Sequence, residues 1–283
     1  MAAVFQHLLL ATEHTEFDIG AERVAMALAR RFQLPLSAVI PLVSNPEYEA
    51  QAPQVAANAE HAAAIKMTQL REAAEAFGVT IALHARRGAD SYLEIIDEAR
   101  ERASDLIVIR RRGKHGFLAN LLLGEMVSNV VAHAPCSVLI VPRGAQLWNR
   151  RILVAAEPTK HGWQLVAIGT AIANECALPL TLVCVTGNDP ARRQQGNAFI
   201  AEAVDSARHN GVPAEGHALV GKPLTTIVEL AERISSDLIV IGSRSDHSIG
   251  RALIGGVAQK IIGLSEHPVL VVHFEEQTEQ ATS

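Results

Sequence analysis

Short aliphatic runs alternate along the chain with longer segments in which apolar residues recur at helical spacing. Runs such as Leu238–Ile241 contain no polar residue, which is typical of a strand buried on both faces of a parallel sheet. This pattern predicts strands at residues 7–12, 36–43, 80–85, 105–109, 137–141, 151–156, 180–185, 214–220, 237–241 and 268–272. It predicts helices at 19–31, 55–77, 92–102, 125–132, 161–176, 198–210 and 224–233, a last helix that opens at 255–256, and loops at 44–53 and 186–197.

The chain contains an internal repeat. The run Asp105–Ile109 recurs as Asp237–Ile241, and His7–Glu13 has its counterpart in Arg151–Glu157. Matched landmarks in the same order indicate a duplicated domain, and strands that alternate with helices favour parallel sheets with right-handed crossovers. We therefore expect an α/β fold of two tandem doubly wound domains, each with a five-stranded parallel sheet. The expected domains are 1–143 and 151–274, with a linker at 144–150.

A glycine loop follows the buried strand that ends at Ile241. Its spacing is Gly242, two residues, Ser245, nine residues and then Gly255-Gly256. A loop that runs from a strand into a helix leaves unpaired N–H groups at the helix start, and the helix dipole makes such a position favourable for an anion. The alternative is an ordinary connection between strand and helix, in which glycine is common for conformational reasons.

This spacing resembles the nucleotide loop Gly-x2-Gly-x9-Gly-Ser/Thr of the universal stress protein superfamily. Ser245 stands in place of the second glycine, and Gly256 stands in place of the final hydroxyl residue. The resemblance covers nearly the whole chain in two copies. It implies a fold like that of the adenine nucleotide alpha hydrolases, and binding of ATP or another adenine nucleotide, with Mg²⁺ present only together with the nucleotide.

The resemblance also implies the contact residues and the way in which the domains pair. An acidic residue at the end of the first strand faces the adenine or ribose, and both copies have glutamate there, Glu13 and Glu157. The last strands of the repeats, which include Val138–Val141 and Val269–Val272, are expected to pair as an intramolecular pseudo-dimer, and a homodimer of whole chains is compatible with that. In the second repeat the implied nucleotide contacts are Ala155, Glu157, Val185, Ile241, Gly242, Ser243, Arg244, Gly255, Gly256 and Val257.

The first repeat departs from the nucleotide pattern. Arg110 stands where the first glycine belongs, and Glu125 replaces the serine or threonine. A carboxylate at a helix N-terminus is stabilised by the dipole and takes the position of a phosphate, which favours a self-capped helix. The basic residues of this loop and of the third strand are a candidate anion site, the alternative being a solvated basic surface. These residues are Arg110, Arg111, Arg112, Lys114, Arg86 and Arg87.

Composition narrows the classes of function. The formal net charge of −5 does not favour nucleic acid as a partner, and no apolar stretch is long enough for a membrane span. The first residues lack the pattern of a signal peptide, so a cytoplasmic protein is expected. The cysteines, Cys136, Cys176 and Cys184, show no Cys-x-x-Cys spacing and are expected to be small buried hydrophobes.

Three functions remain open at this level. The first is a stress-response module that binds an adenine nucleotide, more favourably in the second repeat. The second is an interaction protein of the same superfamily that binds protein partners and no nucleotide. The third is a weak ATPase or adenylyl-transfer enzyme, but the His-x-Gly-His and Ser-Gly-Gly-x-Asp-Ser motifs of such enzymes are not found in the sequence. Neither a general-base constellation nor a metal-ligand motif is recognised, so we expect a protein that is not an enzyme and has no metal site of its own.

Overall fold

The computed structural model describes residues 4–13, 15–111, 124–243 and 254–274. The strands are β1 (Leu8–Ala11), β2 (Leu36–Val43), β3 (Ile81–Gly88), β4 (Leu106–Arg110), β5 (Ser137–Val141), β6 (Ile152–Ala155), β7 (Leu180–Thr186), β8 (Ala214–Val220), β9 (Leu238–Gly242) and β10 (Val269–Val272). The helices are η1 (Glu16–Asp18), α1 (Ile19–Phe32), α2 (Pro46–Gln51), α3 (Pro53–Phe77), α4 (Ser91–Glu101), α5 (Glu125–His133), α6 (Lys160–Cys176), α7 (Pro190–His209), α8 (Pro223–Arg233) and α9 (Gly256–Leu264). The expected α/β class and the two domains with mostly parallel strands are confirmed.

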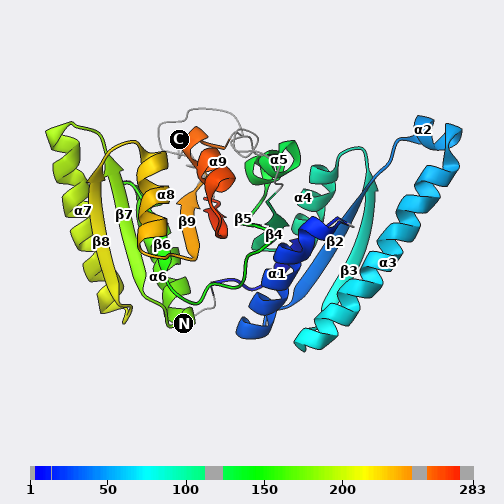
Figure 1. The fold of residues 1–283 in the computed structure, drawn as a ribbon, viewed down its shortest axis with the longest axis horizontal. Coiled ribbons are helices and arrows are strands. Elements are labelled where there is room, and N and C mark those ends of the chain that lie inside the picture. Colours follow the sequence, from blue (N-terminus) through cyan, green and yellow to red (C-terminus); the bar gives the residue numbers. More distant parts are fainter. Residues whose placement is uncertain (1–3, 14, 112–123, 244–253, 275–283) are drawn as a thin grey trace, which may run out of the picture.

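The ten strands of the described residues form one continuous sheet, in the order β3-β2-β1-β4-β5-β10-β9-β6-β7-β8 (Figure 1). The strands within each repeat are parallel, whereas β5 and β10 pair antiparallel at the junction. Leu270 lies opposite Leu139 in this pairing, and both side chains are buried. Because each of these strands would otherwise be an exposed aliphatic edge, the pairing covers both edges at once.

Helices cover both faces of the sheet. Successive strand residues alternate between two cores, as Leu8 and Leu10 do against Leu9 and Ala11. One core includes residues of α1, α3, α6 and α7, and the other includes residues of α4, α5, α8 and α9. The central strands therefore have no solvent-facing side, which is why their sequences are apolar without alternation.

In both repeats, residues with a left-handed backbone conformation follow equivalent helices. Gln33 after α1 and Ala177 after α6 adopt the left-handed conformation, with φ of 54° and 53°. Ala103 and Ser235 do so after α4 and α8. Such a conformation costs a residue with a side chain about 1 kcal/mol, so its recurrence at matched positions reflects a shared backbone rather than a local preference of the residues.

Two of the expected loops contain helix. Residues 46–51 form α2, whose start is stabilised by Asn45, with its side-chain oxygen accepting a hydrogen bond from the Glu47 amide at 3.1 Å. Residues 190–197 form the first two turns of α7, and the Asp189 carboxylate accepts from the Arg192 amide at 3.1 Å. Both starts combine an Asn or Asp cap with a proline at the first helical position, a combination that favours helix initiation.

Candidate functional site

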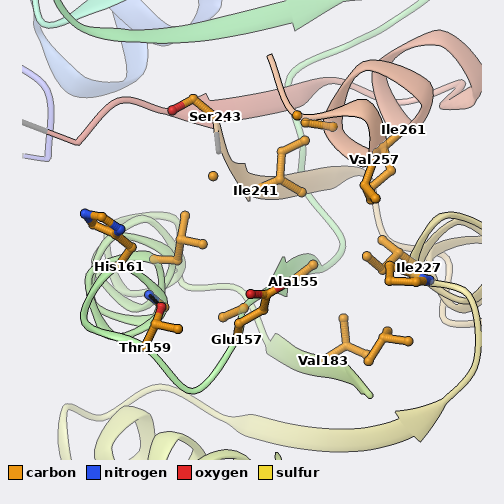
Figure 2. Close-up of a pocket in the computed structure, with 18 of the residues that line it drawn as sticks. Ala155, Glu157, Thr159, His161, Val183, Ile227, Ile241, Ser243, Val257 and Ile261 are labelled. Atoms are coloured by element: carbon orange, nitrogen blue, oxygen red, sulfur yellow. Dashed lines mark hydrogen bonds between the residues drawn. The ribbon is translucent and has the colours of Figure 1, made fainter. Parts of the chain in front are cut away.

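A pocket opens in the second repeat beyond the carboxyl ends of β6, β7 and β9 (Figure 2). From β6 the chain continues to β7 on one side of the sheet, and it reaches β9 on the other side only after α8. The crossovers therefore diverge between β6 and β9, which is the usual place for a ligand in an open parallel sheet. The starts of α6, α8 and α9 complete the walls, and the cavity volume is about 170 Å³.

The structure brings together the described residues of the implied nucleotide set. Nine of the ten line this one pocket, and Arg244 lies outside the described residues. The nine are Ala155, Glu157, Val185, Ile241, Gly242, Ser243, Gly255, Gly256 and Val257. Residues that sequence reasoning did not select also line it, namely Ala156, Thr159, His161, Gly162, Leu165, Val183, Pro223, Ile227, Ala258, Ile261 and Phe274.

The pocket has an apolar part and a polar part. Val183, Ile227 and Ile241 form a buried apolar wall, each with at most 5% of its surface exposed. Figure 2 shows Thr159 and His161 on the side of α6, away from Ile227 and Val183. A ligand with a flat apolar portion and a polar or charged portion would match this division.

The two described ends of the glycine loop, Ser243 and Gly255, meet at the edge of the pocket. The Ser243 amide donates to the Val272 carbonyl at 3.2 Å, and the Gly255 amide donates to the Ser243 carbonyl at 3.1 Å. The two ends of the loop are thus joined, and α9 begins at Gly256 with no side-chain cap. Among the residues that the structure describes, none would lie within 4 Å of a Cβ built on Gly256. The first N–H groups of this helix have no acceptor within the helix, and the residues that carry them line the pocket.

The start of α6 is fixed close to the end of β6. The Thr159 hydroxyl accepts from the Gly162 amide at 3.0 Å, which is an N-cap interaction. A Cβ at Gly162 would lie 1.8 Å from the Glu157 carbonyl oxygen, so only glycine allows this approach. In the sequence, a threonine followed three residues later by a glycine was the signal that could have indicated this helix start.

An aromatic pair stands beside the polar part of the pocket. The rings of His161 and Phe274 stack with centroids 4.5 Å apart and an interplanar angle of 22°. The matching positions of the first repeat, Phe17 and Arg143, also form a contact, with the guanidinium carbon 5.3 Å from the ring centroid. In the second repeat this contact joins the chain after β10 to the start of α6, and in the first it joins the chain after β5 to η1, directly before α1.

The corresponding position of the first repeat is filled by the repeat's own side chains. Arg110 ends β4 as Gly242 ends β9. Its guanidinium donates to the Thr15 hydroxyl at 2.9 Å and to the Glu13 carboxylate, and its Nε lies 3.2 Å from Asp18 Oδ1. The side chains of Arg110 and Asp18 are 5% and 1% exposed. Burial raises the pKa of Asp18, against the opposing attraction of Arg110. Glu13 therefore binds an internal cation here.

The expected cationic cluster of the first repeat is not formed by its described members. Arg86 donates to Glu94 and Glu98, at 3.2 and 2.9 Å, and Arg87 donates to Glu49 at 3.1 Å. β3, which carries both of these arginines, is separated from β4 by β2 and β1. Arg111 and Arg110 are likewise bound to groups of this chain, and Arg112 and Lys114 lie outside the described residues. Nearby carboxylates and carbonyls already bind the described arginines, and the anion site stays a prediction.

Burial suppresses the reactivity of cysteine thiols in the described part of the chain. Burial raises the pKa of the Cys136 thiol to about 12 and that of Cys184 to about 11, which leaves both protonated at neutral pH. The described residues contain no cluster of three or more side chains suited to a metal ion. No helix among them is long and apolar enough to cross a membrane.

Comparisons with known proteins agree on one family. The profile of the Universal stress protein family matches twice, at residues 5–142 and 149–273. A universal stress protein of Methanocaldococcus jannaschii is 35% identical over 28% of this chain and 47% of its own length. One from Thermus aquaticus is 28% identical over 44% of this chain and 98% of its own. The stress response protein NhaX of Bacillus subtilis is 37% identical over 26% of this chain, which spans 44% of that protein.

Solved structures show the same fold over nearly the full length. The structure of a universal stress protein from Archaeoglobus fulgidus superposes with a TM-score of 0.75 and 18% identity, and the match covers 95% of this chain and 96% of the other. A functionally unknown protein from Pseudomonas aeruginosa superposes with a TM-score of 0.67 and 17% identity, over 95% of this chain and 92% of its own.

Proposed function

Because this chain belongs to the universal stress protein family, with one copy of the domain in each repeat, we propose that it is a cytoplasmic stress-response protein that binds ATP or another adenine nucleotide in its second repeat. The observation that carries this proposal is the convergence of nine family-implied positions on one pocket beyond the ends of β6, β7 and β9. These positions come from segments that are distant in sequence, so the fold is what brings them together.

The pocket suits the parts of an adenine nucleotide. The base would lie against the apolar wall of Val183, Ile227 and Ile241, which is buried and would exclude water from one ring face. Glu157, at the end of β6, could accept hydrogen bonds from the ribose hydroxyls. The phosphates would lie at the start of α9, where the helical amides from Gly256 onward have no acceptor within the helix and the helix dipole favours negative charge. Mg²⁺ would enter only with these phosphates.

The first repeat is proposed not to bind nucleotide. Where the second repeat has Gly242 and Gly162, the first has Arg110 and Asp18, and this pair is buried. Glu13, which corresponds to Glu157, is bound to Arg110. A nucleotide could enter only by displacing a buried ion pair, and separating such a pair is strongly unfavourable.

We assign binding rather than catalysis to this protein. The named polar groups of the pocket, Glu157, Thr159, His161 and Ser243, include no activated nucleophile with a general base beside it. A second candidate function is an interaction protein that no longer binds nucleotide. The cavity of about 170 Å³ favours it, because ligand pockets commonly have about 300–1,000 Å³.

A pair of matched substitutions tests the proposal. Gly255 and Gly124 are the N-cap residues of α9 and α5, with nearly equal backbone angles (φ −57° and ψ 138°, against φ −59° and ψ 143°). Aspartate is favourable at an N-cap, so both variants should fold. Gly255→Asp should abolish ATP binding in titration calorimetry by placing a carboxylate at the phosphate position. Gly124→Asp should leave the affinity unchanged, and the opposite pattern would assign the site to the first repeat.

A further inference from the structure

Two arginines of the first repeat reach across to helices of the second repeat. Arg111, directly after β4, donates to the carbonyl oxygens of Gly263, at 3.3 Å, and Ser265. These carbonyls are at the C-terminal end of α9. Arg31, in the last turn of α1, donates to the carbonyl oxygen of Cys176 at 2.7 Å, and Cys176 is the last residue of α6.

Both contacts are of a kind that stabilises a helix end. The last carbonyls of a helix have no intrahelical donor, and they form the negative end of the helix dipole. A guanidinium supplies the missing hydrogen bonds and the opposite charge. The Arg111 side chain is only 13% exposed, so water screens its interaction with the carbonyls weakly. Its ion pair with Glu266 at 3.4 Å contributes little, because that carboxylate is 77% exposed.

The two helices held in this way are two of the three that line the proposed nucleotide pocket, and they do so at their other ends. α9 supplies Gly256, Val257 and Ile261 to the pocket, and α6 supplies His161 and Gly162. α9 is a short rod of nine residues, and at 1.5 Å per residue it is roughly 13 Å long. A tilt at the end held by Arg111 therefore displaces the amides at the pocket.

These stabilising contacts are made by arginines of the first repeat to helices of the second, and not the other way round. Arg111 and Ser243 occupy equivalent positions, since their amides donate to Val141 and Val272, the equivalent ends of the two last strands. Glu175 is the counterpart of Arg31 in α6. Neither Ser243 nor Glu175 carries a guanidinium, so the second repeat cannot form the equivalent hydrogen bonds to helices of the first. The asymmetry of these contacts matches the asymmetry of the sites, because the supported repeat is the one with the open pocket.

We propose that Arg111 is a positioning residue of the nucleotide site, with Arg31 in a supporting role, and that the first repeat serves as the fixed frame on which the site of the second is held. This inference rests on the proposed function. Arg111 touches no ligand and acts through α9, whose N-terminal amides receive the phosphates.

Calorimetric titration with ATP and with adenosine tests this assignment. Arg111→Ala should weaken ATP binding by about tenfold, and it should change adenosine binding less, because adenosine lacks the groups that α9 positions. Arg111→Lys should recover part of the affinity, since lysine keeps the charge but not the forked donors. The control is Arg208→Ala, which removes an arginine-to-carbonyl bond of 3.1 Å to Ala214 at the outer edge of the same repeat and should leave both affinities unchanged.

Hydrogen exchange of the α9 amides without ligand separates this inference from the proposed function. We expect faster exchange in Arg111→Ala and no change in Arg208→Ala. If the parent binds ATP but Arg111→Ala binds it equally well, or loses ATP and adenosine affinity in the same proportion, the positioning role is refuted while the nucleotide site stands. If the parent binds no ATP, the proposed function fails. Unchanged exchange in Arg111→Ala would in addition refute the idea that Arg111 stabilises the end of α9.

Discussion

Replacing Arg110 by glycine gives the first repeat the residue that ends β9 in the second. The guanidinium that is lost lies between Glu13, Thr15 and Asp18, and its side chain is 5% exposed. Its removal leaves the Asp18 carboxylate, which is 1% exposed, without its cation. Breaking a buried pair from one side costs about 3–5 kcal/mol. This corresponds to a fall in melting temperature of roughly 10 °C for a domain of this size.

Removing both charges should be less harmful than removing one. In Arg110→Gly with Asp18→Gly no buried charge is left without its cation, since the Glu13 carboxylate is 30% exposed and water can hydrate it. The double variant should therefore be more stable than Arg110→Gly alone. The control is Arg100→Ala, which breaks an exposed pair of 3.2 Å with Asp97 and should change the free energy of unfolding by less than about 1 kcal/mol. Urea unfolding followed by circular dichroism measures these three variants and Asp18→Gly alone. If Arg110→Gly were as stable as the control, or the double variant lost the sum of both single effects, Arg110 would not be the internal occupant of this site.

Three further outcomes are expected. Lysines at both Leu139 and Leu270, which face each other across the β5–β10 pair, should separate the repeats or cause aggregation, and unchanged scattering profiles and stability would argue against pairing through these strands. Burial raises the pKa of Glu98, but hydrogen bonds from two arginines outweigh burial and leave that pKa below its usual value. As pH falls, the unfolded chain therefore binds this proton before the folded one does, so the stability due to Glu98 is present above the unfolded pKa and is lost in acid. Glu98→Gln should flatten the fall in the free energy of unfolding at acid pH, measured by urea unfolding at a series of pH values. An unaltered fall would exclude this role. Ser245→Gly with Gly256→Ser restores the family loop and should tighten ATP binding at least tenfold, because each change contributes about 1–3 kcal/mol. Equal affinities of parent and variant would mean that these two positions do not limit binding, and Glu157 would be the next residue to examine.

The strands were the most predictable part of the fold. The bounds of β2, β5 and β8 agree with the sequence prediction at both ends, because a proline stands within two residues before each strand and a proline, a glycine or a polar turn follows it. The start of α7 was missed because residues 190–197 are polar, although the Asp189-Pro190 pair is a start signal. Local capping chemistry, rather than hydrophobic periodicity, decided this boundary.

The candidate site was predictable as far as strand ends determine it. Ala155, Val185 and Gly242 could be placed together because parallel strands end at one edge of a sheet. Thr159 and Phe274 were not foreseen, because their approach depends on how α6 starts and where the chain leads after β10. The arginine at position 110 was recognised as a departure from the glycine pattern, but its partner Asp18 could not be identified, since only tertiary packing brings the two together.

Mass spectrometry of ligand released from the natively purified protein, after incubation with ATP and removal of the excess, tests the nucleotide assignment most directly. The account predicts one adenine nucleotide per chain in the parent and in Gly124→Asp, and none in Gly255→Asp. Two equivalents per chain would contradict the closure of the first repeat by Arg110. No nucleotide in the parent would contradict the central claim and favour an interaction protein without a nucleotide ligand.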